Sequence, residues 1–354
     1  MAVNSRLPLE TQTLYAELLE HLLGLEAQRS VGSLAGSFTA KQVKGETYVY
    51  YQASLPGGKT RQFYLGRKSP TLDRLAVRFA RERAALAADV ARVARMAAQL
   101  RAGGAGVTDA ASARVVSGLA DAGVFAAGGV LVGTHAFIAI GNLLGVRWTS
   151  GSLRTQDVDV GSSRELDVDV AVPDLQLDLP AALENLKMGF LPVPALDPRR
   201  PSTSFKVRGQ ALRVDLLCPG RGGDDAPIFI PRWNAAAQPL VYLGFLLESP
   251  ERAVILANTA ALVNVPTPAR FAFHKLLVAQ LRPAAFAAKA EKDVLQAVQV
   301  LAVLVEDRPG DLALAWEALE ALGPAVMKGI QRGLTAVERR ARGLRARIRQ
   351  ATER

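Results

Sequence analysis

Two aspartates separated by a single valine, Asp157 and Asp159, place the tightest constraint on the fold of this chain. They lie in a Val-rich segment that favours a β-strand, and alternate residues of a strand point to the same face. Two carboxylates on one face can share a pair of divalent cations roughly 4 Å apart, the arrangement that phosphoryl and nucleotidyl transfer use. The alternative is that they form only the polar edge of a half-buried strand, so the rest of the chain has to distinguish the two interpretations.

The composition restricts the classes of partner and site that the chain can have. Its 354 residues suffice for two or three domains, and a net charge of +10 favours an anionic partner, nucleic acid first and an acidic membrane surface second. The single cysteine, Cys218, excludes an internal disulfide and a cysteine-based zinc site, and three histidines disfavour a site made of histidine alone. Without an N-terminal apolar segment or an apolar run of roughly 20 residues, we expect a cytoplasmic protein with no membrane partner.

Residues 1–105 are predicted to form an N-terminal domain. Its periodicities predict, in order, a helix, three short strands and a long helix, over 7–29, 36–43, 46–53, 60–66 and 71–100. The strands interleave aromatic with basic side chains: Tyr48, Tyr50, Tyr51, Phe63 and Tyr64 with Lys41, Lys44, Lys59, Arg61, Arg67 and Lys68. Such a meander is either a platform for nucleic acid or a sheet whose aromatic residues form its hydrophobic face, and both interpretations stay open.

Residues 106–265 are predicted to form a core domain, and residues 266–354 a helical domain with a basic tail. The helical domain begins with a cap at Thr267, and its helices are expected over 268–281, 284–306, 310–322 and from 324. Its tail, residues 336–354, carries seven Arg against two Glu. The fold class is therefore α+β: a mixed sheet with flanking helices, preceded by a small β-meander and followed by a helical bundle.

Two further features of the core join the aspartate pair. Before it, an apolar strand ends at Val132, turns through Gly133 and Thr134 and enters a helix, whose N-terminus is suited to a phosphate. After it, the alternating segment Arg213–Leu217 predicts a strand that carries Asp215. If Asp215 lies beside the pair, the three carboxylates offer only oxygen ligands, which suit Mg²⁺ or Mn²⁺.

These residues resemble the polymerase-beta-like nucleotidyltransferase superfamily, whose pattern is an apolar residue, Gly, a small residue, Asp-x-Asp and a third acidic residue on a distant strand. Within it the chain is similar to a bacterial nucleotidyltransferase-fold family related to abortive-infection-type nucleotidyltransferase toxins. The resemblance covers roughly 110–305 and lies in the stretches LVGTHAF, TQDVDV, LRVDLLCP, VNVPTPARFAFHKLLVAQLR and KDVLQA. Thr134 stands where Ser is usual and keeps the hydroxyl.

The resemblance implies an NTP substrate and assigns roles to particular residues. Asp157, Asp159 and Asp215 would be catalytic and would bind the metal, and the nucleotide would be bound by Gly133, Thr134, Lys275 and Asp293. From the residues themselves, Lys275 sits among apolar neighbours, where it either meets phosphate oxygens or only covers apolar surface. Together with the resemblance, phosphate contact is the favoured interpretation.

Three other residues or pairs compete for a role. Asp167 and Asp169 repeat the spacing of the pair but lack a Gly-Thr turn just upstream, so they are interpreted as the polar face of a neighbouring strand. His135 is interpreted as a packed residue and His274 as one that orients substrate, and neither is assigned to catalysis.

The sequence thus predicts a metal-dependent nucleotidyltransferase that moves a nucleoside monophosphate from an NTP to a hydroxyl acceptor. The basic excess and the aromatic strands favour RNA, with tRNA as one candidate, as that acceptor, and a toxin or phage-defence setting rests on resemblance alone. Two alternatives are a catalytically silent nucleic-acid-binding protein and an enzyme that modifies another protein. The sequence does not indicate the oligomeric state.

Overall fold

The protein is described from a computed structural model, which places residues 4–27, 36–54, 60–149, 155–162, 177–195, 197, 199–220, 222 and 225–353. The strands are β1 Asn4–Arg6, β2 Gly36–Val43, β3 Glu46–Ser54, β4 Thr60–Arg67, β5 Gly129–Val132, β6 Val146–Trp148, β7 Asp157–Ser162, β8 Phe190–Pro192, β9 Ser204–Val207, β10 Arg213–Pro219, β11 Ile228–Ile230, β12 Ala235–Leu240, β13 Glu251–Leu256 and β14 Ala260–Val265. The helices are α1 Leu9–Ala27, α2 Pro70–Ala102, α3 Ala110–Asp121, α4 Gly133–Leu143, α5 Leu179–Asn185, α6 Leu243–Leu247, α7 Pro268–Leu281, α8 Ala287–Asp307, α9 Pro309–Ala321, α10 Pro324–Arg340 and α11 Leu344–Thr352.

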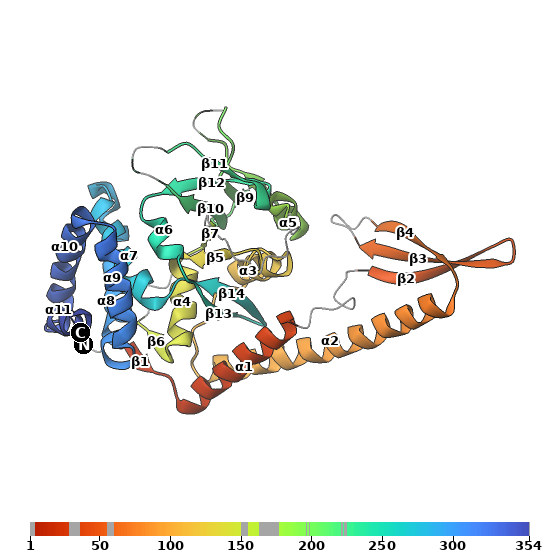
Figure 1. Cartoon of the computed structure of the whole chain (residues 1–354), viewed down its shortest axis with the longest axis horizontal. Helices are drawn as coiled ribbons and strands as arrows, with labels where there is room; N and C mark the ends of the chain where they lie inside the picture. Colours follow the sequence, from red (N-terminus) through yellow and green to blue (C-terminus); the bar gives the residue numbers. More distant parts are fainter. Residues whose placement is uncertain are drawn as a thin grey trace.

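A mixed sheet forms the centre of the molecule, with the strand order β11-β12-β10-β7-β5. Strand β10 runs parallel to both β7 and β12, whereas β5 is antiparallel to β7. The first half of β10 also pairs with β9, which continues the sheet to β8. The predicted α+β class is confirmed, and Figure 1 shows helices on both sides of this sheet.

The C-terminal helices α7 to α11 pack together on one side of the sheet (Figure 1). Their buried residues, such as Phe273, Leu301 and Ile330, belong to the same hydrophobic core as Val158 and Val214 of the central strands. The expected helical bundle is therefore present, and it shares its core with the sheet that carries the predicted carboxylates.

The predicted three-stranded meander is present as the antiparallel sheet β2-β3-β4. It lies at the far end of α2 from the central sheet (Figure 1). Around the other end of α2, Tyr15, Leu18 and Leu100 form a second core that includes Val254 of β13. The residues of the predicted N-terminal domain are thus divided between a projecting arm and a base that packs on the core.

Two short elements escape the sequence patterns. Strand β1 pairs with β6, and Arg6 binds Asp307 of α8 with two hydrogen bonds, the longer of them 2.7 Å. Strands of three residues have too few side chains to show a period, so their pairing is decided by the tertiary structure. Asp167 and Asp169 lie outside the described residues. Among the helices of the described ranges, none is long and apolar enough to cross a membrane.

A buried asparagine connects the β13-β14 hairpin to the segment that leads into the Gly133 turn. Asn264 Nδ2 donates to the carbonyls of Phe125 and Gly129, both at 2.8 Å, and its Oδ1 accepts from Arg252 at 2.7 Å. The side chain is only 7% exposed, so these backbone carbonyls depend on it for their hydrogen bonds.

We expect Asn264→Ala to lower the free energy of unfolding by about 2–4 kcal/mol, because it leaves buried carbonyls unpaired. Urea unfolding followed by circular dichroism measures this loss. The matched control is Asn258→Ala, at an exposed site where the amide oxygen accepts from Arg101, and it should cost below about 0.5 kcal/mol. Equal losses in the two variants would contradict the assigned role of Asn264.

Candidate active site

The pairing of β7 with β10 brings the three predicted carboxylates to one face of the central sheet. In the parallel register, Asp159 lies opposite Asp215, and Asp157 lies opposite Arg213. The alternate residues, valines and a leucine, are fully buried in the core: Val158, Val160, Val214 and Leu216. Burial of these apolar side chains obliges the charged residues to occupy the other, more accessible face.

Gly133 allows the next strand to approach this face closely. Its φ of +69° is in the left-handed region, and a Cβ at this position would come within 2.2 Å of Oδ2 of Asp159. The turn therefore needs glycine for both backbone and space. Helix α4 starts at this residue with Val132 at its N-cap, and an apolar side chain cannot accept from the N–H groups of the first turn. Because these N–H groups lack a side-chain partner, this end of the helix, next to Asp159, is suited to binding an anion.

The charge of Asp159 is poorly compensated. Burial raises the pKa of its carboxyl to about 7, and the charges of Asp215 and Asp157 add to this effect more than Lys275 and Arg213 oppose it. A carboxylate with its pKa near neutrality, surrounded by two others, is stabilised by a bound cation.

Asp215 is held by two neighbours that the sequence analysis did not assign to the site. Nε of Arg213 donates to Oδ1 of Asp215 at 2.6 Å, and the hydroxyl of Ser204 donates to the same oxygen. Arg213 also donates to Ser204 Oγ at 2.7 Å, which closes a three-membered network. Strand alternation places Arg213 on the face of Asp215 and could have identified it. Ser204 comes from β9, whose pairing with β10 no local pattern indicates.

A cavity of about 960 Å³ separates this face from the C-terminal helices. On the sheet side it is lined by Gly133, Asp159 and Asp215, and on the helix side by Lys275 and other cations. A volume of this size is sufficient for a nucleotide. The apolar part of the lining, which could contact a nucleobase, comes mainly from α6, α7 and the segment after them: Leu243, Leu246, Phe271, Val278, Leu281 and Phe286.

Asp293 fixes two cations of the helical wall. It is buried and accepts from Lys275 Nζ at 2.8 Å and from Arg282 Nε at 2.6 Å. Burial opposes its charge, but the two cations outweigh burial and keep the pKa of Asp293 below its ordinary value. Since Asp293 is absent from the cavity lining, it would act on a nucleotide through Lys275 and Arg282, which are present in that lining.

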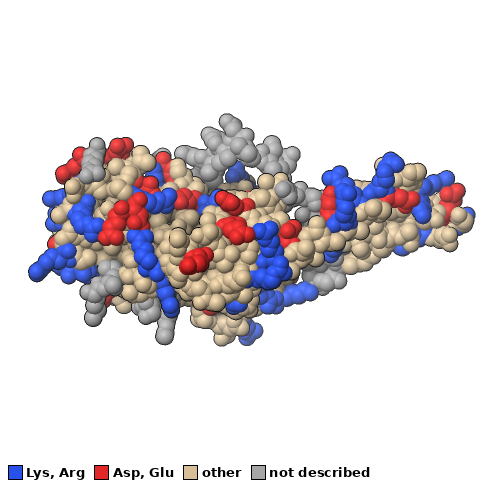
Figure 2. Space-filling model, turned by 90° about the horizontal axis from the view of Figure 1, so that it is seen from below, with Lys and Arg blue, Asp and Glu red and all other residues tan. Residues whose placement is uncertain are grey.

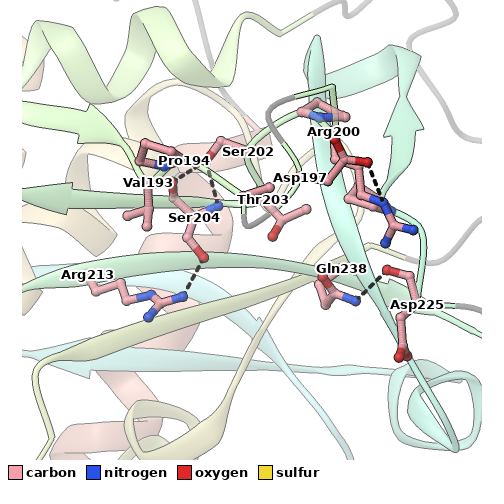
Figure 3. Close-up of a pocket in the computed structure, with 13 residues that line it drawn as sticks. Val193, Pro194, Asp197, Arg200, Ser202, Thr203, Ser204, Arg213, Asp225 and Gln238 are labelled. Carbon is pink, nitrogen blue, oxygen red and sulfur yellow. Dashed lines mark hydrogen bonds and ion pairs between the residues drawn. The ribbon is translucent and has the colours of Figure 1, made fainter.

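A second cavity has a volume of about 530 Å³ and shares lining residues with the first, and Figure 3 shows the residues that line it. Both cavities are lined by Thr203, Ser204, Arg213, Asp225 and Gln238. In Figure 3, Ser204 and Arg213 point toward one another at the edge that the two cavities share. The Asp215 network thus lies between a nucleotide-sized space and a second, smaller space.

The donor chemistry of this face fits a hard divalent cation. Three carboxylates supply only oxygen ligands, and burial, together with the charges of Asp215 and Asp157, raises the pKa of Asp159. Within the described part of the chain, however, no three His, Cys, Asp or Glu side chains already stand in a metal-binding cluster. The hydrogen bonds of Asp215 Oδ1 to Arg213 and Ser204 direct this oxygen toward those partners rather than toward the pair on β7.

Both histidines near the site are buried and neutral. Burial lowers the pKa of His135 to about 4, and that of His274 to about 3, where Lys275 adds to the effect. His274 lines the larger cavity, whereas His135 is 1% exposed and packed in α4, as predicted for it. Thr134 is also buried, and neither Thr134 nor Asp157 is among the residues that line the cavity.

Comparison with known proteins identifies the family. The sequence profile of a family described as nucleotidyltransferase matches residues 110–320. The chain belongs to this nucleotidyltransferase family. The match includes every predicted site residue, from Gly133 to Asp293, and excludes the β2-β4 arm.

The chain is distantly similar to one solved structure. The crystal structure of an antigenic nucleotidyltransferase-like protein from Paracoccidioides brasiliensis matches with 13% sequence identity and a TM-score of 0.37, covering 69% of this chain and 94% of that chain. No curated protein sequence matches the chain. The assignment to the nucleotidyltransferase family therefore rests on the profile match.

The close approach at Gly133 can be tested by adding one methyl group. We expect Gly133→Ala to lower the free energy of unfolding by about 3 kcal/mol or more, from backbone strain and from the contact with Asp159. The matched control is Gly209→Ala, which has a φ of +75° and open space around its Cβ, and which should cost only about 1–2 kcal/mol. Thermal and urea unfolding measure both. If the free energy of unfolding falls no more at Gly133 than at Gly209, the Asp159 side chain moves away from the added methyl group without loss of stability.

The raised pKa of Asp159 predicts a dependence of stability on pH in metal-free buffer. Between about pH 4 and pH 7 the unfolded chain releases a proton that the folded protein retains, so the free energy of unfolding falls as the pH rises. Asp159→Asn removes this effect and should stabilise the protein at pH 8 by on the order of 2 kcal/mol, with no gain at pH 4.

Urea unfolding in EDTA at several pH values provides the measurement for Asp159→Asn. The exposed substitution Glu184→Gln serves as control and should change the stability by below about 0.5 kcal/mol throughout. A gain for Asp159→Asn that is the same at pH 4 and pH 8 would contradict the prediction.

Proposed function

We propose that this member of the nucleotidyltransferase family transfers a nucleoside monophosphate from an NTP to a hydroxyl group of RNA, with Mg²⁺ or Mn²⁺ as the metal. The observation that carries the proposal is that Asp159 and Asp215 lie opposite each other on neighbouring strands beside the Gly133 turn, across a nucleotide-sized cavity from Lys275. A cytoplasmic location, as expected from the sequence, and a toxin or phage-defence setting, which only the resemblance supports, are further parts of the proposal.

Different residues of the cavity bind the phosphates and the nucleobase of the NTP. The first turn of α4, at Gly133 and Thr134, offers backbone N–H groups to the phosphates. Lys275 and Arg282 offset the phosphate charge from the opposite wall, and Asp293 keeps both cations in place. The nucleobase occupies the apolar part of the cavity near Phe271.

The carboxylates act at the reacting phosphate. Asp157, Asp159 and Asp215 would hold the divalent metal, which when bound offsets charge on the phosphate oxygens. The acceptor oxygen forms a bond to the α-phosphorus while the bond to the pyrophosphate oxygen breaks, and pyrophosphate leaves. Asp215 lines the larger cavity, and its partners Ser204 and Arg213 line both, so we assign to its carboxylate the orientation of the acceptor hydroxyl and the removal of its proton.

Two observations support RNA as the acceptor. The chain carries a net charge of +10, which favours a polyanion over a small neutral acceptor. The smaller cavity provides hydroxyl, amide and guanidinium groups next to Asp215, which are suitable partners for a ribose and a phosphate.

The transfer reaction can be tested with α-labelled NTPs, Mg²⁺ or Mn²⁺, and total RNA. We expect label to enter RNA, and Asp159→Asn and Asp215→Asn to lower the rate at least about a hundredfold, equivalent to about 3 kcal/mol. Asp73→Asn, an exposed carboxylate on α2, should leave the rate unchanged.

The distribution of label tests each part of the proposal. Label in protein instead of RNA would contradict the acceptor. Transfer by Asp159→Asn at the wild-type rate, or no transfer to any acceptor, would contradict the assigned reaction.

A further inference from the structure

The two faces of the β2-β4 sheet have different surroundings. On one face Phe38 and Tyr51 make edge-to-face contacts with Phe79 of α2, at ring-centroid distances of 5.2 and 6.1 Å. Phe79 is 6% exposed, so this face forms the small core that attaches the sheet to the helix. The requirement for a hydrophobic face, one of the two interpretations left open by the sequence, is therefore met by these residues.

The opposite face carries a second set of aromatic rings that the packing does not need. Tyr48 and Tyr50 alternate on β3, and Tyr64 of β4 contacts both, at centroid distances of 6.1 and 5.5 Å. Tyr64 is 58% exposed, whereas Tyr48 and Tyr50 are half-buried. Exposed aromatic rings grouped on one face of a sheet are characteristic of surfaces that bind a partner.

Cations border these rings. Lys41 lies 5.1 Å from the centre of the Tyr50 ring, and Arg67 lies 5.9 Å from that of Tyr48. Figure 2 shows basic and acidic side chains along the whole arm, but the described part of the sheet and its last turn, 36–54 and 60–68, holds five cations and one acidic residue, Glu46. Glu46 stands 3.8 Å from Arg67, so the face keeps a positive excess.

We propose that this face of the β2-β4 sheet binds an unpaired nucleic-acid strand, whose bases stack on Tyr48, Tyr50 and Tyr64 and whose phosphates contact Lys41 and Arg67. Aromatic faces stack on any base, and cations beside them neutralise the backbone, so the combination suits a strand with unpaired bases. A duplex hides the faces of its bases and would use the charges alone.

The position of the arm separates this binding from the transfer chemistry. Helix α2 has 33 residues and is roughly 50 Å long, with the sheet at its far end (Figure 1). A strand bound there would have to extend, or belong to a folded RNA, to reach the Asp215 network. That the bound strand is the acceptor rests on the function proposed above, whereas the binding itself does not.

The test is fluorescence anisotropy of the full-length protein with a labelled oligonucleotide of about 12 nucleotides, in EDTA and without NTP. RNA and DNA versions of the strand show which backbone is bound better, and a duplex of the same length tests the need for unpaired bases. We expect the triple variant Tyr48→Ser, Tyr50→Ser, Tyr64→Ser to raise Kd at least about tenfold, whereas replacing the same tyrosines with Phe keeps Kd within about threefold of wild type.

A charge variant provides a second, independent measurement. Lys41→Gln with Arg67→Gln should raise Kd and lower the slope of log Kd against log salt by about 0.7 for each lost phosphate contact. The matched control, Lys328→Gln with Arg208→Gln, removes two exposed positive charges elsewhere and should change Kd by less than about twofold.

Several outcomes would overturn the proposal. The first is equal affinity for duplex and single strand, and the second is an equal loss of affinity in the charge variant and its control. The third is wild-type binding by the Ser variant. If that variant also loses self-association in sedimentation, the face is an interface between copies. If the Ser variant does not fold by circular dichroism, the Phe and charge variants still decide. Because no NTP is present, failure here leaves the transfer assay unaffected, and the reverse also holds.

Discussion

The register between β7 and β10 is the constraint on which the rest of the site depends. It sets Asp159 opposite Asp215 and Asp157 opposite Arg213, and so concentrates negative charge at one place on the sheet. Repulsion and burial would disfavour this arrangement, as the raised pKa of Asp159 shows. The valines on the reverse face hold it in place, because a shift by one residue would expose Val158 and Val160 and bury the carboxylates.

The surrounding elements limit the cost of that charge without removing it. Arg213 neutralises Asp215 from the same strand, and Lys275 approaches from the helical wall with Asp293 behind it. Asp293 is buried and paired with two cations behind the cavity wall, whereas Asp215 pairs with Arg213 through Oδ1 and lines the larger cavity. This asymmetry is what a transfer site requires, since its cations must be fixed while its carboxylates remain available to a ligand.

The arm adds a second kind of surface to the molecule. Its sheet uses one face to pack on α2 and leaves a face of tyrosines and cations exposed. The match to the nucleotidyltransferase profile begins at residue 110, after the arm, so the arm lies outside the part of the chain that the profile covers. In the proposed function, the core supplies the chemistry and the arm contributes to the choice of nucleic acid.

The sequence by itself determined most of the elements and the nucleotidyltransferase family. Period-two and helical patterns predicted the meander, the strands of Asp157 and Asp215 and the C-terminal helices. They could do so because the order of apolar and polar residues along a segment reflects which of its faces is buried. Only the tertiary structure decided which groups meet. Ser204 joins Asp215 through pairing between β9 and β10, Asp293 is drawn to Lys275 and Arg282 by helix packing, and the tyrosines divide between two faces of a sheet. These contacts join residues from separate strands and helices, and their free energies depend on burial and distance, which no local sequence pattern records.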